Sequence, residues 1–257
     1  MIFTLFRKEI MSFLNSLIGY LAIVVFLVIN GLFLWVFPLG FNIVDNGYAS
    51  LDNLFMIAPF VFLFLIPAIT MRSFADEKRS GTIEMLLTKP ITDLQLILAK
   101  FAAGVTLVLF SLIPTLVYAV SVYILGLPSG NMDLGGMWGS YLGLVFLGSA
   151  FVAIGIFVSS LTDNQIIAFI LALTLSGFSY IGFDALADLA LFGKADLFIM
   201  SLGIQAHYAS MSRGVIDTRD VIYFLSLISV FVLSTRIVLE SRKWEKEEKK
   251  TNHQPSN

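Results

Sequence analysis

The sequence predicts an all-α integral membrane protein with six transmembrane helices in a single domain. Its 257 residues are 58% hydrophobic and 13% charged, and the mean hydropathy is +0.89, whereas ordinary soluble domains carry about 25% charged residues. Six apolar runs are each close to the ~20 residues that a helix needs to cross the hydrocarbon core. The alternating pattern of membrane β-strands is absent from the sequence. One polytopic helical domain therefore accounts for the whole chain.

Polar loops separate the predicted spans. The spans cover residues 17–37, 54–71, 100–125, 138–161, 165–183 and 221–239, and a charged tail follows at 240–257. Pro59 and Pro67 lie inside the second span. Neighbouring helices have to satisfy the backbone groups that these prolines release.

Basic residues are distributed unequally between the two sides of the predicted bundle. Of the 16 lysine and arginine residues, 13 fall on the side that holds both chain ends and the loop between the second and third spans. Because loops rich in lysine and arginine stay in the cytoplasm, we expect both termini and this loop to be cytoplasmic. The net charge of −2 gives no indication of nucleic-acid binding.

The segment 184–220, between the fifth and sixth spans, is too apolar for a free loop. Its two apolar stretches are seven and nine residues long, and Gly193 and Lys194 separate them, so neither reaches the ~20 residues of a span. We expect short exoplasmic helices that dip into the outer leaflet or lie on it as a cap over the pathway. The alternative is that the segment only decorates the surface of the protein and has no part in a pathway.

The first 16 residues have the pattern of an amphipathic helix at the membrane interface. Apolar residues, Phe6 among them, recur at helical spacing around Arg7, Lys8 and Glu9. The alternative is that these residues form the early turns of the first span.

The longest charged interval between two apolar runs extends from Met71 to Phe101. Residues 76–79 form a polar patch of mixed sign, and a serine and a glycine then interrupt the chain. Thr82 can cap a helix that starts at Ile83, and Pro90 would end it.

Within this predicted helix the apolar residues share one face. Ile83, Leu86 and Leu87 recur at the spacing i, i+3, i+4, and Glu84 lies on another face. This spacing is typical of a helix that lies on a surface or against a partner, although a solvated loop with charges that set the topology is the alternative. Thr92 or Asp93 can cap the next helix.

Small residues recur along the predicted fourth span. Gly135, Gly139 and Gly143 are four residues apart, the spacing that allows two helix backbones to approach closely. The stripe can serve packing inside the chain or a contact between subunits, and we favour the first.

The sequence gives little support to catalysis. It has two histidines, His207 and His253, no cysteine, and no motif with the spacing of a metal site or of a phosphate-binding loop. His207 lies near Ser201 and Ser210, but a structural role fits a lone histidine better. If ATP drives this protein, another chain must bind it. No ionisable residue lies at mid-depth in a predicted span, which disfavours a proton-coupled carrier.

Two segments resemble one known family. Residues 77–91, EKRSGTIEMLLTKPI, followed by Lys100 at the start of a membrane helix, resemble the cytoplasmic loop of ABC-2 type transporter permeases. Residues 207–227, HYASMSRGVIDTRDVIYFLSL, are similar to the exoplasmic segment and final span of the same permeases. This second segment is most like the subgroup named for bacterial gliding motility in the Bacteroidetes.

The resemblance implies a role for each segment. It implies an amino-terminal elbow helix at Phe6, Arg7, Lys8 and Glu9. It implies a coupling helix that rests on the ATPase subunit, with the site residues Glu77, Arg79, Thr82, Ile83, Glu84, Leu86, Leu87, Lys89 and Pro90. Glu77, Arg79, Glu84 and Lys89 would set charge pairing at its rim. It implies an exoplasmic cap that includes Gly193, His207, Arg213, Gly214 and Asp217.

The resemblance also implies the function. The chain is expected to be the permease subunit of an ATP-driven ABC transporter in a bacterial inner membrane, serving export or force transmission linked to gliding. ABC ATPase subunits would bind ATP and magnesium, and a second permease chain, identical or related, would complete the pathway. The chain itself is expected to bind no cofactor or metal and to be no enzyme. The alternative is a secondary carrier or membrane scaffold that has no nucleotide-binding partner.

Overall fold

The structure, a computed structural model, describes residues 2–45, 47–82, 91–190 and 193–252. All regular elements in these ranges are helices. In chain order they are α1 (Ile2–Leu14), α2 (Leu17–Trp35), α3 (Asp52–Thr70), α4 (Ala75–Arg79), α6 (Asp93–Leu112), η1 (Ile113–Thr115), α7 (Leu116–Leu125), α8 (Leu134–Leu161), α9 (Gln165–Gly177), the π-helical η2 (Phe178–Gly182), α10 (Phe183–Asp188), η3 (Gly193–Ala195), α11 (Asp196–Ser201), α12 (Ile204–Met211) and α13 (Thr218–Asn252).

Five continuous helical stretches are long and apolar enough to cross a membrane, counted over the described ranges. They are Asp52–Arg79, Asp93–Leu125, Leu134–Leu161, Gln165–Asp188 and Thr218–Ser241. The first predicted span corresponds to α2, which follows α1 after a bend of 65°, so that the bent pair makes a sixth candidate.

Local signals in the sequence account for several helix starts. Thr92 caps α6 and forms a capping box with Gln95, in which each side chain bonds the backbone amide of the other residue. Ser16, Asp133 and Asn164 accept hydrogen bonds from first-turn amides of α2, α8 and α9. The predicted cap at Thr92 is therefore confirmed.

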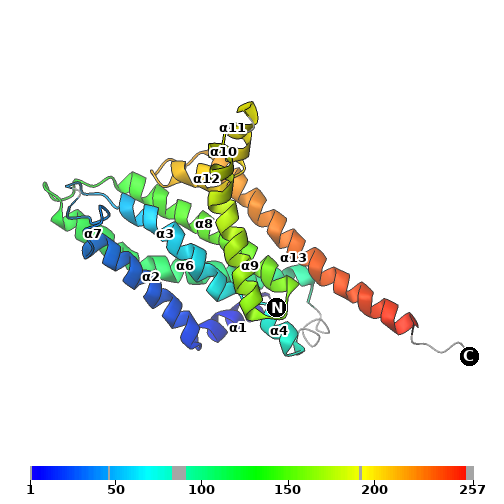
Figure 1. The fold of residues 1–257 in the computed structure, drawn as a ribbon. Helices are drawn as coiled ribbons and strands as arrows, with labels where there is room; N and C mark the ends of the chain where they lie inside the picture. The colour runs from blue at the N-terminus through cyan, green and yellow to red at the C-terminus, as the bar shows by residue number, and fades with distance from the viewer. Residues whose placement is uncertain (1, 46, 83–90, 191–192, 253–257) are drawn as a thin grey trace, which may run out of the picture.

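The centre of the bundle is α8, which packs against α3, α6, α9 and α13. In Figure 1 it runs alongside α3 and α6 in the body of the molecule. At one end of α9 lie the short helices α10 to α12, and near the other end lie α1 and α4. We call these the α12 end and the α4 end.

The predicted packing glycines on α8 lie in different surroundings. A Cβ atom on Gly139 would lie 2.5 Å from the carbonyl oxygen of Gly214, and one on Gly143 would lie 2.8 Å from Cβ of Met211. Gly135 differs, because the nearest atom to a Cβ there is Oδ1 of Asp133 at 3.4 Å. Gly139 and Gly143 thus bring α8 against the end of α12 and the turn that follows it.

We expect Gly139→Ala to destabilise the fold by about 1–3 kcal/mol, because the added methyl group meets backbone atoms that no side-chain rotation can move away. The matched control is Gly135→Ala on the same helix. It adds the same methyl group at van der Waals distance from one side-chain oxygen and should be neutral or slightly stabilising through helix propensity. Unfolding in mixed micelles, followed by tryptophan fluorescence, measures both. Equal losses for the two variants would contradict this account.

Candidate functional site at the α4 end of the bundle

Helix α4 is a single turn of five residues, ADEKR, that follows α3 directly. Its successive side chains contact different parts of the bundle. Asp76 accepts a hydrogen bond from Nε2 of Gln165, in the first turn of α9. Lys78 donates to the carbonyl of Ser160, at the end of α8. These two bonds fasten α4 to the tight turn between α8 and α9.

The side chain of Glu77 points instead to a buried ion cluster. Nζ of Lys100, on α6, lies 2.8 Å from Oε1 of Glu77 and 3.1 Å from Oε1 of Glu9, on α1. Nζ of Lys8 lies 3.6 Å and 3.5 Å from the same two oxygens. Only 2% of the Lys100 side chain is exposed, against 56% of the Lys8 side chain. Three separate helices, α1, α4 and α6, therefore meet at one cation.

The cluster balances its charges at formal neutrality, with two carboxylates and two ammonium groups. Lys100 is buried, and a buried ammonium is costly unless it is paired and hydrogen-bonded. The two carboxylates supply that pairing, and the ring of Phe74, with its centroid 5.0 Å from Nζ, adds a favourable π face. Removing any one of the buried charges would leave the remaining charges unbalanced.

Ser159 of α8 joins α3 to α4. Its hydroxyl accepts hydrogen bonds from the amides of Phe74 at 3.0 Å and Ala75 at 3.1 Å, and it donates to the carbonyl of Met71 at 3.0 Å. Ser159 is fully buried. This one hydroxyl satisfies the hydrogen-bonding needs of two amides at the start of α4 and of the carbonyl that follows α3. It therefore helps to define the path of the chain between the two helices.

Glu77 lies deeper than a charged rim that faces a partner would place it. Its carboxylate is inside the ion cluster and only 13% of its side chain is exposed, and its role in coupling stays a prediction. Arg79 and Thr82 are exposed. The other predicted coupling residues lie outside the described part of the chain, and their role stays a prediction: Ile83, Glu84, Leu86, Leu87, Lys89 and Pro90.

The predicted elbow residues all lie on α1, which packs against α6 and α2. Glu9 is buried and faces Lys100, whereas Arg7 and most of Lys8 are exposed. Phe6 is half-buried, with its ring 6.3 Å from that of Phe3. Glu9 thus joins the predicted elbow to the loop that carries α4.

At the α12 end, His207 links α12 to α11 and α13. Its Nδ1 lies 2.7 Å from Oδ1 of Asp220, and its Nε2 lies 2.9 Å from the carbonyl oxygen of Ser201. The ring stacks on Tyr223 at 3.8 Å. Ser210 donates its hydroxyl to Asp220 and to the backbone carbonyl of His207, and not to the histidine ring. The ring therefore bonds the hydroxyl of neither Ser201 nor Ser210, and His207 has the structural role of holding α11, α12 and α13 together.

The other predicted cap residues differ in their contacts. Gly214 adopts the left-handed conformation, with φ of +81°, and a Cβ there would lie 2.2 Å from Cα of Gly136. Gly193 is also left-handed but lies in open space. Arg213 is exposed, and Asp217 accepts a hydrogen bond from the amide of Arg219 at the start of α13. Among these residues Gly214 makes the closest packing contact.

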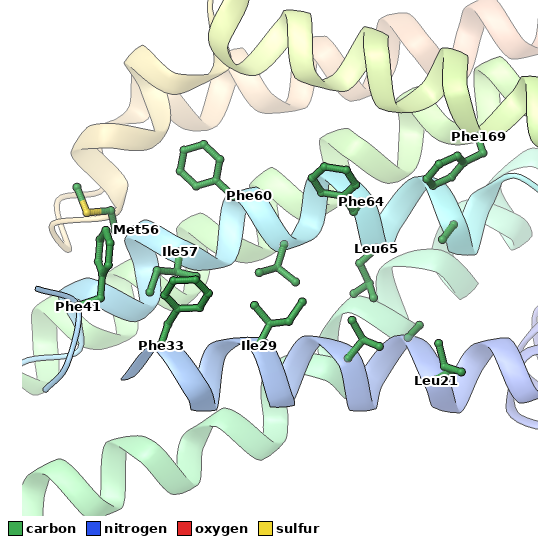
Figure 2. Close-up of a pocket in the computed structure, with 14 residues that line it drawn as sticks. Leu21, Ile29, Phe33, Phe41, Met56, Ile57, Phe60, Phe64, Leu65 and Phe169 are labelled. Carbon is green, nitrogen blue, oxygen red and sulfur yellow. The ribbon is translucent and has the colours of Figure 1, made fainter. Parts of the chain in front are cut away.

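An apolar groove of about 830 Å³ runs between α2 and α3 and reaches α9. Figure 2 shows Leu21, Ile29 and Phe33 of α2 directed toward α3. All of its side chains are apolar: Leu21, Ala22, Val25, Ile29, Phe33, Phe41, Met56, Ile57, Phe60, Val61, Phe64, Leu65, Ala68 and Phe169. The groove offers no polar group to orient a charged molecule.

Comparison with known families decides what kind of protein this is. The model of the family described as "ABC-2 family transporter protein" matches residues 3–239, nearly the whole chain. The chain belongs to this family. An ABC-2 family protein of this kind is a membrane subunit of an ABC transporter, and the helical bundle described above is the corresponding membrane domain.

Individual relatives are more distant. The chain is 28% identical over 134 residues to the "Probable multidrug ABC transporter permease YbhR" of Escherichia coli strain K12, and equally to that of Escherichia coli O157:H7. The match covers 50% of this chain and 34% of each relative, so the chain spans only about a third of their length. The resemblance to ABC-2 permeases is thus confirmed at the level of the family, and the gliding-motility subgroup stays a prediction.

Two residues that organise this end of the ABC-2 protein, Lys100 and Ser159, lie outside the site residues predicted from the sequence. Lys100 belongs to the family-like segment, but the sequence does not show its two carboxylate partners. Ser159 lies on the predicted fourth span and belongs to no motif. A signal for Lys100 was present, because a lysine at a span boundary that is followed by an apolar run needs a nearby carboxylate if it is buried. No local signal distinguishes Ser159 from Ser160.

Proposed function

We propose that this chain is the permease subunit of an ATP-driven exporter in a bacterial inner membrane, and that separate ABC ATPase subunits bind ATP and magnesium and drive it. The observation that carries this proposal is the attachment of α4. The charged turn that leads into the 83–90 segment is joined by ion pairs to α1 and α6 and by hydrogen bonds to α8 and α9. A loop that receives force from an ATPase must be attached in this way, because a freely moving loop would absorb the motion.

The distribution of basic residues supports the orientation. With 13 of 16 lysines and arginines on the side of α1, α4 and the chain ends, the α4 end faces the cytoplasm, where ATP is available. The α12 end then faces outward. The printed name of the Escherichia coli relatives, a multidrug permease, favours export, and the segment 207–227 favours a link to gliding as the second candidate process.

A second permease chain, identical or related, is part of the proposal. The outer faces of α2 and α9 carry exposed apolar side chains, and the groove between α2 and α3 lies beside them. A partner permease packed on this side would enclose a pathway between the two chains. The alternative function, a secondary carrier or scaffold, requires no ATPase at the α4 end.

The test is purification of the chain from its native membranes with its associated subunits. We expect an ABC ATPase to co-purify, and the chain alone to hydrolyse no ATP. Glu84→Lys should lower recovery of the ATPase, because it reverses a charge in the predicted coupling segment. The matched control is Asp45→Lys, an exposed charge reversal in the loop before α3, which should leave recovery unchanged. Recovery of the chain without any ATPase, under mild crosslinking, would favour the carrier or scaffold.

A further inference from the structure

Pro59 leaves one backbone carbonyl of α3 without its usual donor. In an α-helix the amide of residue 59 would bond the carbonyl of Phe55, but proline has no amide hydrogen. Phe55 is buried, with 2% of its surface exposed. An unsatisfied carbonyl at such a position is costly, so a neighbouring group is expected to satisfy it.

The hydroxyl of Tyr208, on α12, occupies that position. It donates to the carbonyl oxygen of Phe55 at 2.7 Å, across 153 residues of sequence. Tyr208 is itself buried, at 3% exposure. Burial, and next the charge of Tyr180, raise the pKa of Tyr208 well above its ordinary value. The hydroxyl therefore keeps its proton and acts as the donor.

A second irregularity faces the same place. The π-helical segment η2 interrupts the helix between α9 and α10, and its Tyr180 ring packs edge-on against Phe60 at 5.9 Å and lies 6.4 Å from the ring of Tyr208. Proline positions and π-helical turns are the usual sites at which long helices bend. Tyr208 and Tyr180 thus connect the proline position of one span and the π-helical segment of another to the short helices of the α12 end.

The same face of α12 also contacts α8, because Met211 follows Tyr208 by three residues. Met211 packs against Gly143 of α8, which has no side chain in the way. This face of α12 therefore rests on both the central helix α8 and the proline position of α3. A displacement of α12 away from the bundle has to break the bond to Phe55.

We propose that the hydroxyl of Tyr208 replaces the missing amide of Pro59 and thereby couples the position of α12 to the backbone of α3 at its proline, so that the α12 end opens only when this hydrogen bond breaks. Tyr208 is a positioning residue, because it acts through the backbone of α3. The role of this opening in transport rests on the proposed function, whereas the coupling itself does not.

The experiment measures how often α12 leaves the bundle, in the full-length chain in lipid nanodiscs without ATPase or substrate. The chain has no cysteine, so a single Met211→Cys variant reports the exposure of a fully buried position through its rate of maleimide labelling. Tyr208→Phe should raise this rate roughly two- to tenfold, the range that one neutral buried hydrogen bond represents.

Restoring the amide supplies the decisive comparison. Pro59→Ala returns the donor to the Phe55 carbonyl, so Tyr208→Phe in that background should change the labelling rate by less than about twofold. Tyr223→Phe is the matched control, because Tyr223 also donates its hydroxyl to a backbone carbonyl at 2.7 Å, that of Leu202, in an intact helix–turn contact. Its effect should be the same with either residue at position 59.

Two results would overturn the proposal. One is an equal effect of Tyr208→Phe with proline or alanine at position 59, and the other is no effect in the proline background. If Pro59→Ala does not fold, Pro59→Gly restores the same amide and gives the same comparison. Since no transport is measured, failure here leaves the proposed function standing, and loss of ATPase co-purification leaves this coupling standing.

Discussion

Lys100→Met is expected to destabilise the protein more than the other single substitutions considered at the α4 end. It removes the central cation of the ion cluster and leaves the carboxylates of Glu77 and Glu9 close together in a largely buried place. Breaking a buried ion pair in this way costs about 3–5 kcal/mol. The half-exposed Lys8, 3.5–3.6 Å from both oxygens, remains and should hold the loss toward the lower end of that range.

The measurement is the free energy of unfolding in mixed micelles, followed by the fluorescence of the three tryptophans. The same preparation should also lose ATPase co-purification, because α1 and α4 are no longer held to α6. A loss below about 1 kcal/mol would mean that the cluster is solvated and contributes as little as a surface ion pair.

Neutralising the three buried charges of the cluster distinguishes the effect of charge from that of side-chain volume. Adding Glu9→Gln and Glu77→Gln to Lys100→Met removes the negative charges while keeping side-chain size similar, and only the half-exposed Lys8 stays charged. Most of the lost stability should return, because replacement of buried ion partners by neutral groups is often close to neutral. Persistent instability of the triple variant would show that the methylene packing of Lys100, and not its charge, holds the three helices.

Spans and caps could be predicted because their signals are local. A run of about 20 apolar residues is required by the thickness of the bilayer, and the described residues form five helical stretches of this kind, or six with the bent pair α1 and α2. The cap at Thr92 is equally local, since its partner Gln95 is three residues away. A signal whose residues lie within one or two helical turns does not depend on tertiary packing, so it can be predicted from the sequence.

The inward position of Glu77 could not be predicted from such signals. A helix of five residues has no repeating face, so periodicity cannot tell which of its charges points inward. The partner Lys100 is 23 residues away, and Lys100 in turn pairs with Glu9 across 91 residues. Only the packing of α1 against α6 brings these three side chains together. The same holds for Tyr208, whose partner is the backbone carbonyl of Phe55. The only sign of this in the sequence is Pro59, four residues later, which has no amide hydrogen to bond that carbonyl.

Ser159→Ala is the second substitution expected to have a large effect. It removes a single oxygen atom, but the buried amides of Phe74 and Ala75 and the carbonyl of Met71 all lose the partner that they share. Each buried group left unsatisfied costs about 1–3 kcal/mol, and partial access of water at this end of the bundle should bring the total to about 2–4 kcal/mol.

The neighbouring Ser160 supplies the matched control for this substitution. It is buried like Ser159, but its hydroxyl bonds only the carbonyl of Phe157 in its own helix, and its contact with Lys78 uses the backbone carbonyl, which Ser160→Ala retains. We expect Ser160→Ala to change the free energy of unfolding by less than about 0.5 kcal/mol. Hydrogen exchange gives an independent measurement, because the amides of Phe74 and Ala75 should lose protection in Ser159→Ala and keep it in Ser160→Ala. Equal losses of stability in the two variants, or retained protection of both amides in Ser159→Ala, would mean that the path from α3 to α4 is set by the ion cluster alone.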